Sequence, residues 1–234
     1  LMERAGQAVV DVILKRWTQL AKRGVLVVAG KGNNGGDGLV IARLLKDREF
    51  PCEVACVAQE RELSPDAATN LERYRTVGGL FTEIPLGDVD SLNQRILEKG
   101  LLVDALLGTG LSRPLDGFLA GVVELMNTSG VPVVAVDTPS GLDSDRGVPQ
   151  GATIQAEVTV TFGYPKIGQV VHPGATYSGE LVVADIGIPT DRWPQVTDGA
   201  VRLLTAASEL AEGIAVVREV SLMVGGADMN QADR

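Results

Sequence analysis

The sequence predicts an α/β fold with a mostly parallel central sheet and helices on both faces. Apolar runs of strand length alternate with amphipathic helical patterns through residues 1–136, and this alternation is typical of parallel sheets. The strand-like runs are apolar at consecutive positions, as expected for strands covered on both faces. Glycine-rich and polar segments follow several of these runs, which is where ligands bind in open parallel sheets.

The elements follow one another in a regular order. Apolar residues recur at helical spacing from Met2 to Leu20, which predicts a first helix that ends before Gly24. Beyond it, strands and helices are expected to alternate. The strands are expected at residues 25–29, 53–58, 80–84, 101–106 and 131–136. The helices are expected at residues 39–45, 66–77, 92–97 and 115–126.

The alternation of predicted strands and helices ends after Asp137. Two strand-like runs, 158–162 and 181–184, have only loop predicted between them, and we expect them to add strands at one end of the sheet. Beyond residue 189 the pattern weakens. Residues 203–215 favour a helix, and residues 216–226 are ambiguous.

The composition excludes several classes of protein. The chain has 234 residues and a formal net charge of −9 without a strongly basic run, so no nucleic-acid partner is expected. It has no stretch of about 18 apolar residues and no signal-peptide pattern, so we expect a cytoplasmic protein without a membrane contact. One histidine and two cysteines cannot form a Cys/His zinc site. Cys52 and Cys56 would lie roughly 13 Å apart on one strand, too far for a disulfide, and we expect buried thiols.

The first polar segment is the loop Gly-Lys-Gly-Asn-Asn-Gly-Gly-Asp-Gly at residues 30–38. Glycines allow backbone N–H groups to approach a ligand, and a helix N-terminus attracts anions, so a phosphate is the expected guest. Gly30, Gly32 and Gly35 satisfy G-x-G-x-x-G, a weak signal alone, and no Gly-Lys-Ser/Thr completes a phosphate-binding P-loop. The alternative interpretation is a glycine-rich turn with Asp37 as a helix cap.

Three more strand ends carry polar residues. Asp104 is embedded in an apolar strand end, where burial is costly unless a cation or hydrogen-bond donors meet it, and a second glycine-rich loop with Arg113 follows. Asp137 and Ser140 follow the next strand, and Lys166 follows the strand after that. Each could instead be structural: a carboxylate bound by loop amides, a turn cap or a solvated lysine. Their shared position at strand ends favours one ligand site.

Taken together, these segments resemble the NAD(P)H-hydrate epimerase family, which also forms the N-terminal half of bifunctional nicotinamide nucleotide repair enzymes. The matching segments are Leu-Met-Glu-Arg-Ala-Gly at 1–6, Asn-Asn-Gly-Gly-Asp-Gly at 33–38, Val-Asp-Ala-Leu-Leu-Gly-Thr-Gly at 103–110, Asp-Thr-Pro-Ser-Gly at 137–141, Phe-Gly-Tyr-Pro-Lys at 162–166, and 179–189. Thr138 stands where that family more often has Ile, which we expect to be a tolerated packing change. The resemblance implies one domain at 1–189, with 190–234 as an extension or linker.

The resemblance further implies a Rossmann-like three-layer sandwich, usually a homodimer. It implies an isomerase that interconverts the R and S forms of hydrated NADH or NADPH and is coupled to a dehydratase. The implied substrate-binding residues are Asn33, Asn34, Gly35, Gly36, Asp37, Gly108, Thr109, Gly110, Leu111, Ser112, Arg113, Pro114 and Asp137. The implied potassium (K⁺) ligands are Asn34, Asp104 and Ser140, whose oxygens suit a hard cation. We expect Asp137 to act as the acid/base, assisted by Lys166.

Two other functions remain open from the sequence. The G-x-G-x-x-G match would fit an NAD-dependent dehydrogenase, which needs an acidic ribose ligand roughly 20 residues further on. Gln59 and Glu60 are imperfectly placed for that role. A non-catalytic nucleotide-binding scaffold is the other alternative, although it would not require Asp37, Asp104, Asp137, Ser140 and Lys166 together.

Overall fold

The computed structural model describes residues 1–111, 113–188, 202–207 and 214–223, and the last two segments as strands alone. The strands are β1 Val25–Ala29, β2 Cys52–Cys56, β3 Leu80–Glu83, β4 Leu101–Ala105, β5 Val133–Val136, β6 Val158–Phe162, β7 Glu180–Ala184, β8 Arg202–Ala207 and β9 Ile214–Met223. The α-helices are α1 Met2–Lys22, α2 Asn33–Asp47, α3 Pro65–Thr76, α4 Val89–Leu97, α5 Gly117–Thr128, α6 Ile167–Val170 and α7 Gly174–Ser178. A short 3₁₀ helix spans Glu60–Glu62.

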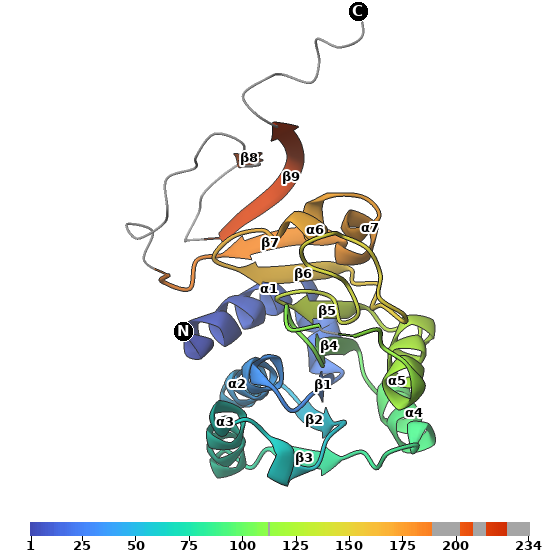
Figure 1. Cartoon of the computed structure of the whole chain (residues 1–234). Coiled ribbons are helices and arrows are strands. Elements are labelled where there is room, and N and C mark those ends of the chain that lie inside the picture. The colour runs from blue at the N-terminus through green and yellow to red at the C-terminus, as the bar shows by residue number, and fades with distance from the viewer. Residues whose placement is uncertain (112, 189–201, 208–213, 224–234) are drawn as a thin grey trace, which may run out of the picture.

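The strands form one sheet in the order β3-β2-β1-β4-β5-β6-β7-β9-β8 (Figure 1). Strands β1 to β7 pair in parallel, and β9 pairs antiparallel with both β7 and β8. The chain builds outward from β1 in one direction and then returns to add β4 on its other side. The ends of β1 and β4 therefore form the crevice where open α/β sheets bind their ligands.

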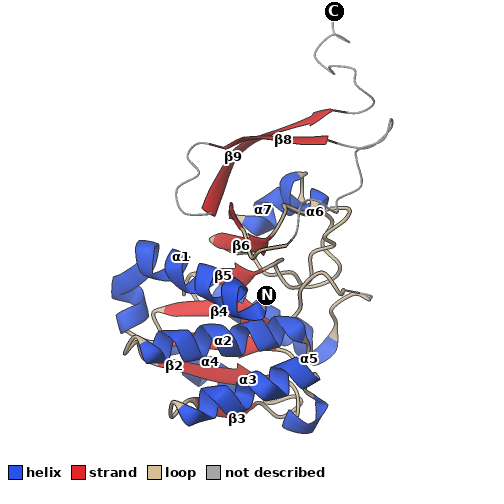
Figure 2. Ribbon diagram, turned by 90° about the vertical axis from the view of Figure 1, so that its left-hand side faces the viewer, coloured by secondary structure: helices blue, strands red, loops and turns tan. Residues whose placement is uncertain are grey.

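Helices cover both faces of the sheet, as the sequence predicts. Val25, Val27 and Ala29 of β1 pack into a core with α1, α2 and α3, whereas Leu26 and Val28 pack into a second core with α4 and α5. Figure 2 shows α1, α2 and α3 in front of the strands. Because successive side chains of a strand point to opposite faces, a strand buried on both faces must be apolar throughout. The expected α/β sandwich is confirmed.

Most predicted elements are present, with two corrections. Strands β1 to β7 match the seven strand-like runs up to residue 184, and the expected buried thiols Cys52 and Cys56 are both buried and free. The helix predicted at 203–215 is wrong: β8 and the start of β9 lie there. The β-branched residues from position 214 onward favour an added strand, and Gly213 disfavours a helix. Helices α6 and α7 lie where only loop was predicted, because such short helices show no periodicity.

No helix in the part of the chain that the structure describes is both long and apolar enough to cross a membrane.

Candidate functional site

The expected polar residues gather where parallel strands end. Asp104 lies in β4, Asp137 directly follows β5, and Lys166 follows β6. Asp37 lies near the N-terminus of α2, the helix that follows β1. Strands β1, β4, β5 and β6 are consecutive parallel neighbours in the sheet. The segments that follow them therefore lie together at the carboxyl-terminal ends of the strands.

Two glycines of the first loop allow the N-terminus of α2 to pack closely against the ends of these strands. A Cβ atom at Gly30 would lie 2.0 Å from the carbonyl oxygen of Leu106, and one at Gly35 would lie 1.9 Å from the carbonyl oxygen of Gly30. Only glycine permits such an approach between backbone segments. These two glycines of the G-x-G-x-x-G pattern are therefore required by packing, whatever ligand the loop binds. A Cβ at Gly32 would meet no atom within 4 Å.

Asp104 is a fully buried carboxylate held by Ser140. Its Oδ1 accepts from Ser140 Oγ at 2.6 Å and from the Leu106 amide at 3.2 Å, and its Oδ2 accepts from the Ser140 amide at 2.8 Å. Burial raises the pKa of Asp104 to about 6, although the bonds from Ser140 and Leu106 act in the opposite direction. No ion pair within the described residues reaches this carboxylate. A buried carboxylate without a cation is costly.

Asn34 approaches the same segment from α2. Its buried side-chain oxygen would lie 3.4 Å from a Cβ at Gly108, and the Leu107 amide donates to Ser140 Oγ at 2.9 Å. The buried Nδ2 atom of Asn34 has no hydrogen-bond partner. Because amide oxygen and nitrogen exchange places on a flip, the protein does not fix which atom faces this space.

The expected set Asn34, Asp104 and Ser140 therefore converges on residues 106–108. A buried unpaired carboxylate, a hydroxyl and an unfixed amide are a donor set that a hard monovalent cation can take. No cluster of three or more His, Cys, Asp or Glu side chains suited to a metal occurs among the described residues. Any cation here would thus depend on neutral oxygen ligands beside a single carboxylate.

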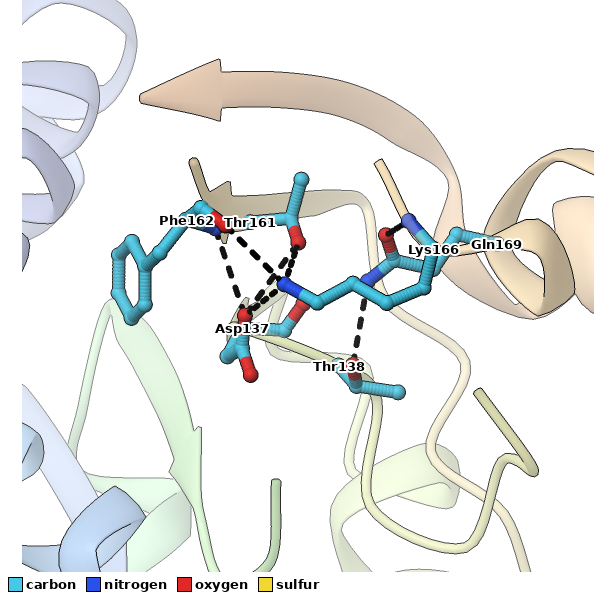
Figure 3. A network of polar contacts seen from close by, with 6 residues as sticks. All are labelled: Asp137, Thr138, Thr161, Phe162, Lys166 and Gln169. Atoms are coloured by element: carbon cyan, nitrogen blue, oxygen red, sulfur yellow. Dashed lines mark hydrogen bonds and ion pairs between the residues drawn. The ribbon is translucent and has the colours of Figure 1, made fainter. Parts of the chain in front are cut away.

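Asp137 and Lys166 form an ion pair between the ends of β5 and β6 (Figure 3). The ammonium group of Lys166 also donates to Thr161 Oγ1 at 2.7 Å and to the Phe162 carbonyl at 3.3 Å. Thr161 Oγ1 and the Phe162 amide in turn each donate to Asp137 Oδ1 at 3.3 Å. Both charged side chains are mostly buried, with 17% of Asp137 and 22% of Lys166 exposed. The structure thus brings the two expected catalytic residues together, while their catalytic role stays a prediction.

Gln169 binds the backbone of Asp137, a contact that no sequence motif predicted. Asp137 has a φ of 64°, a left-handed conformation that is rare outside glycine. Gln169 Nε2 donates to the Asp137 carbonyl at 2.5 Å and to Thr138 Oγ1 at 3.2 Å, while its Oε1 accepts from the Lys166 amide at 2.9 Å (Figure 3). Thr138 is therefore a hydrogen-bond acceptor and not only a packing change. A glutamine three residues beyond Lys166 carries no motif that could have identified it.

Asp37 lines a cavity of about 570 Å³. Neither Asp137 nor Lys166 is among its lining residues, but Phe162 is, and the Phe162 amide donates to Asp137. Burial and, to a smaller extent, the negative charge of Asp137 together raise the pKa of Asp37 to about 7, against the opposing effect of the Leu1 amino group. No hydrogen bond or ion pair within the described part of the chain reaches the Asp37 carboxylate. The cavity lining includes Asp37, Asn33, Phe162, Met2, Asn70 and Arg73.

Comparisons with known proteins identify the family. A family model described as YjeF-related protein N-terminus matches residues 1–168 of the chain. The chain belongs to this family. Relatives of this chain differ in length, so the chain spans a different share of each one.

Two curated relatives and one solved structure illustrate this YjeF-related family. The bifunctional NAD(P)H-hydrate repair enzyme Nnr of Moorella thermoacetica is 45% identical over 81% of this chain, which spans 36% of that enzyme. The NAD(P)H-hydrate epimerase of Limosilactobacillus fermentum is 38% identical over 79% of this chain, which spans 84% of that protein. The crystal structure of yeast ynu0 has a TM-score of 0.68 and 28% identity, covering 82% of this chain and 80% of its own.

In this YjeF-related chain the second expected binding loop stays apart from the cavity. Gly108 and Leu111 are half-buried, whereas Thr109, Gly110, Arg113 and Pro114 are exposed. None of these described residues lines the cavity around Asp37. Ser112 lies outside the described residues, as do most of residues 190–234. Substrate binding by this loop stays a prediction, and so does the division of the chain at residue 189.

Proposed function

We propose that the chain is an NAD(P)H-hydrate epimerase, an isomerase that interconverts the R and S forms of hydrated NADH and NADPH. The observation that carries the proposal is the Asp37 carboxylate in the lining of the cavity, together with the Asp137–Lys166 ion pair, which contacts the cavity-lining residue Phe162. The names of relatives that this chain matches over most of its length support the same reaction.

The reaction requires a transient positive charge. The carbon that bears the added hydroxyl is bonded to the ring nitrogen, whose lone pair can expel the hydroxyl as water and leave a planar cation. Water then adds to the other face of the ring. Such a cation is stabilised by a fixed carboxylate in a site that excludes bulk solvent. Asp137 is suited to this role because Lys166, Thr161 and Phe162 hold its carboxylate in place.

The nucleotide portion of the substrate is proposed to contact the α2 N-terminus and the loop after β4. Free backbone N–H groups at a helix N-terminus favour phosphate, and Asn33 lies at the first position of α2. The proposed contacts are Asn33, Asn34, Gly35, Gly36, Asp37 and residues 108–114. Arg113 is exposed in the second loop, where its guanidinium could bind a phosphate.

A potassium ion is proposed to be held by Asn34, Asp104 and Ser140. When bound, it would supply a fixed positive charge that offsets the buried charge of Asp104. Asp104 and Ser140 would in this way hold the loop after β4 against the loop after β5, beside the proposed nucleotide site. A homodimer, a cytoplasmic location and functional coupling to an NAD(P)H-hydrate dehydratase are part of the same proposal, and bifunctional relatives support the coupling.

The dehydrogenase alternative is less well supported. It needs a free acidic residue after β2 to bind ribose, but the Glu60 carboxylate is paired with Arg75 at 2.6 Å. The scaffold alternative does not account for a cavity that faces an unpaired carboxylate.

The test supplies the R form of hydrated NADH together with an S-specific dehydratase and its nucleotide, and follows the recovery of NADH absorbance. We expect the chain to accelerate recovery over the reaction without it, and more strongly in potassium than in an equal concentration of a large organic cation. Absence of acceleration in either salt would contradict the epimerase proposal. Acceleration that is equal in both salts would support the epimerase and contradict the potassium site.

A further inference from the structure

We propose that Asp37 is the catalytic acid/base of the epimerisation, while the carboxylate of Asp137, held in place by Lys166, stabilises the cationic ring. This inference rests on the proposed function, and it assigns the proton transfer to a different carboxylate from the one that the sequence suggests. Three features of the site lead to it: the position of Asp37, the difference between its surroundings and those of Asp137, and the engagement of Lys166.

The position of Asp37 places its carboxylate beside the reacting space. Asp37 and Phe162 line the same cavity, and the Phe162 amide donates to Asp137 Oδ1 at 3.3 Å. The two carboxylates reach this place from different elements, Asp37 from α2 and Asp137 from the end of β5. The negative charge of Asp137 contributes to the raised pKa of Asp37. Asp137 does not itself line the cavity, so a hydrated ring there would contact Asp37 directly and would lie next to Phe162, whose amide binds Asp137.

The two carboxylates have opposite surroundings. Asp137 is bound by an ammonium group, a hydroxyl and a backbone amide, all of which donate to its carboxylate. Asp37 has no such partner within the described residues. In enzymes with two carboxylates in different environments, the poorly solvated one holds the proton and the well-bound one stays charged. By this rule Asp37 is the proton carrier.

Lys166 is not free to replace Asp37 as the acid. Its ammonium group has three acceptors: the Asp137 carboxylate, Thr161 Oγ1 at 2.7 Å and the Phe162 carbonyl at 3.3 Å. An ammonium group has three N–H donors, so all of them are engaged. Lys166 is thus a positioning residue that fixes the charge of Asp137.

The charges around Asp37 allow titration near neutral pH. Burial and the charge of Asp137 together raise the pKa of Asp37 to about 7, and the Leu1 amino group opposes the shift. The cavity is also lined by three charged residues, which are Glu3 on α1 and Asp66 and Arg73 on α3. Lys166 is paired with Asp137. A group that titrates near the working pH can both donate and recover a proton efficiently.

The proposed reaction conserves protons, electron pairs and charge. The Asp37 carboxyl gives its proton to the hydroxyl oxygen, and the C–O bond breaks with its electron pair going to the departing water. The lone pair of the ring nitrogen forms a C=N bond, so one positive charge arises on the ring and one negative charge on Asp37. After the planar ring turns about its bond to the ribose, water adds to the other face, the nitrogen recovers its lone pair, and the excess proton returns to Asp37.

The test compares Asp37→Asn with Asp11→Asn. Asp11 is exposed on α1 outside the cavity, so its substitution makes the same chemical change without touching the site. Epimerisation would be measured between pH 6 and 9, with the uncatalysed rate subtracted at each pH. We expect D37N to lower kcat at pH 7 by about 100-fold or more, with KM changed less than about threefold. The wild type and D11N should lose kcat tenfold per pH unit well above pH 7, whereas the residual rate of D37N should not.

A second measurement does not depend on activity. In the folded chain, burial raises the pKa of Asp37 to about 7, whereas the pKa of an unfolded aspartate is near 4. The free energy of unfolding should therefore fall as pH rises from about 4 to 7, and this fall should be smaller in D37N. Asp104, whose pKa is also raised by burial, is present in both proteins, so their difference isolates Asp37.

The outcomes separate the two proposals. If the wild type accelerates epimerisation but D37N keeps its kcat and its pH dependence, Asp37 is not the acid/base and the epimerase proposal stands. If D37N changes KM alone, Asp37 is a binding residue and the inference is wrong. If the wild type does not accelerate epimerisation at all, the proposed function fails and the inference fails with it.

Discussion

The ends of β4 and β5 each carry an aspartate, yet the two carboxylates are stabilised in different ways. Asp137 is paired with Lys166 and is 17% exposed. Asp104 is fully buried and is bound by Ser140 and a backbone amide, without an ion pair in the described part of the chain. The protein itself supplies a cation for Asp137, whereas only hydrogen-bond donors of the described residues meet Asp104. The same residue type at equivalent places in neighbouring strands is thus stabilised by an ion pair in one case and by hydrogen bonds in the other.

The largest effect is expected from removing the charge of Asp137. Asp137→Asn should lower kcat for epimerisation by about 10³-fold, because the cationic ring loses its fixed carboxylate. Nucleotide binding, measured by calorimetry with hydrated NADH, should change little. Lys166→Met should also lower activity, and it should destabilise the fold by about 1–3 kcal/mol because it leaves Asp137 unpaired and mostly buried.

The double variant Asp137→Asn with Lys166→Met provides the control for this pair. It removes both charges together, so chemical denaturation should show a stability nearer to the wild type than that of Lys166→Met alone. Its activity should stay as low as that of Asp137→Asn. Near-normal turnover in either Asp137 variant would exclude the proposed role of this carboxylate.

A smaller effect, on stability and salt response, is expected at Asp104. Potassium should raise the thermal stability of the wild type above that in a large organic cation at equal ionic strength. Asp104→Asn should remove this response and gain stability when potassium is absent, because it removes a buried charge. Ser140→Ala should lose about 1–3 kcal/mol of stability, since it leaves Asp104 Oδ1 and the Leu107 amide without their bonds to Oγ.

The Asp137 and Lys166 variants serve as controls for Asp104. They alter only the Asp137–Lys166 ion pair, so potassium should raise their thermal stability as much as it raises that of the wild type. Loss of the response in these variants, or its survival in Asp104→Asn, would show that the ion does not bind where the buried carboxylate lies.

The sequence was sufficient for strands β1 to β7 and for the identities of the charged residues, but not for the partners of these residues. Strands β1 and β5 are apolar and buried throughout, which follows from the local sequence. Asp104 and Asp137 were recognisable because a charge at an apolar strand end needs a partner. That Lys166 pairs with Asp137 and Ser140 with Asp104 depends on strand order, which the sequence does not specify. Gln169 was missed because a polar residue in a loop carries no periodic signal.

The smallest effect that separates these two strand ends is expected from Gln169. It is 2% exposed, and its amide ties the Asp137 carbonyl and Thr138 to the Lys166 backbone. Gln169→Leu removes these bonds without removing a charge, so Asp137 should lose its fixed orientation and kcat should fall about tenfold with little change in KM. Thr138→Val removes only one acceptor of the same amide and should have a smaller effect. Because neither variant touches Asp104, both should keep the potassium response, and a loss of that response in Gln169→Leu would mean that the two strand ends are coupled.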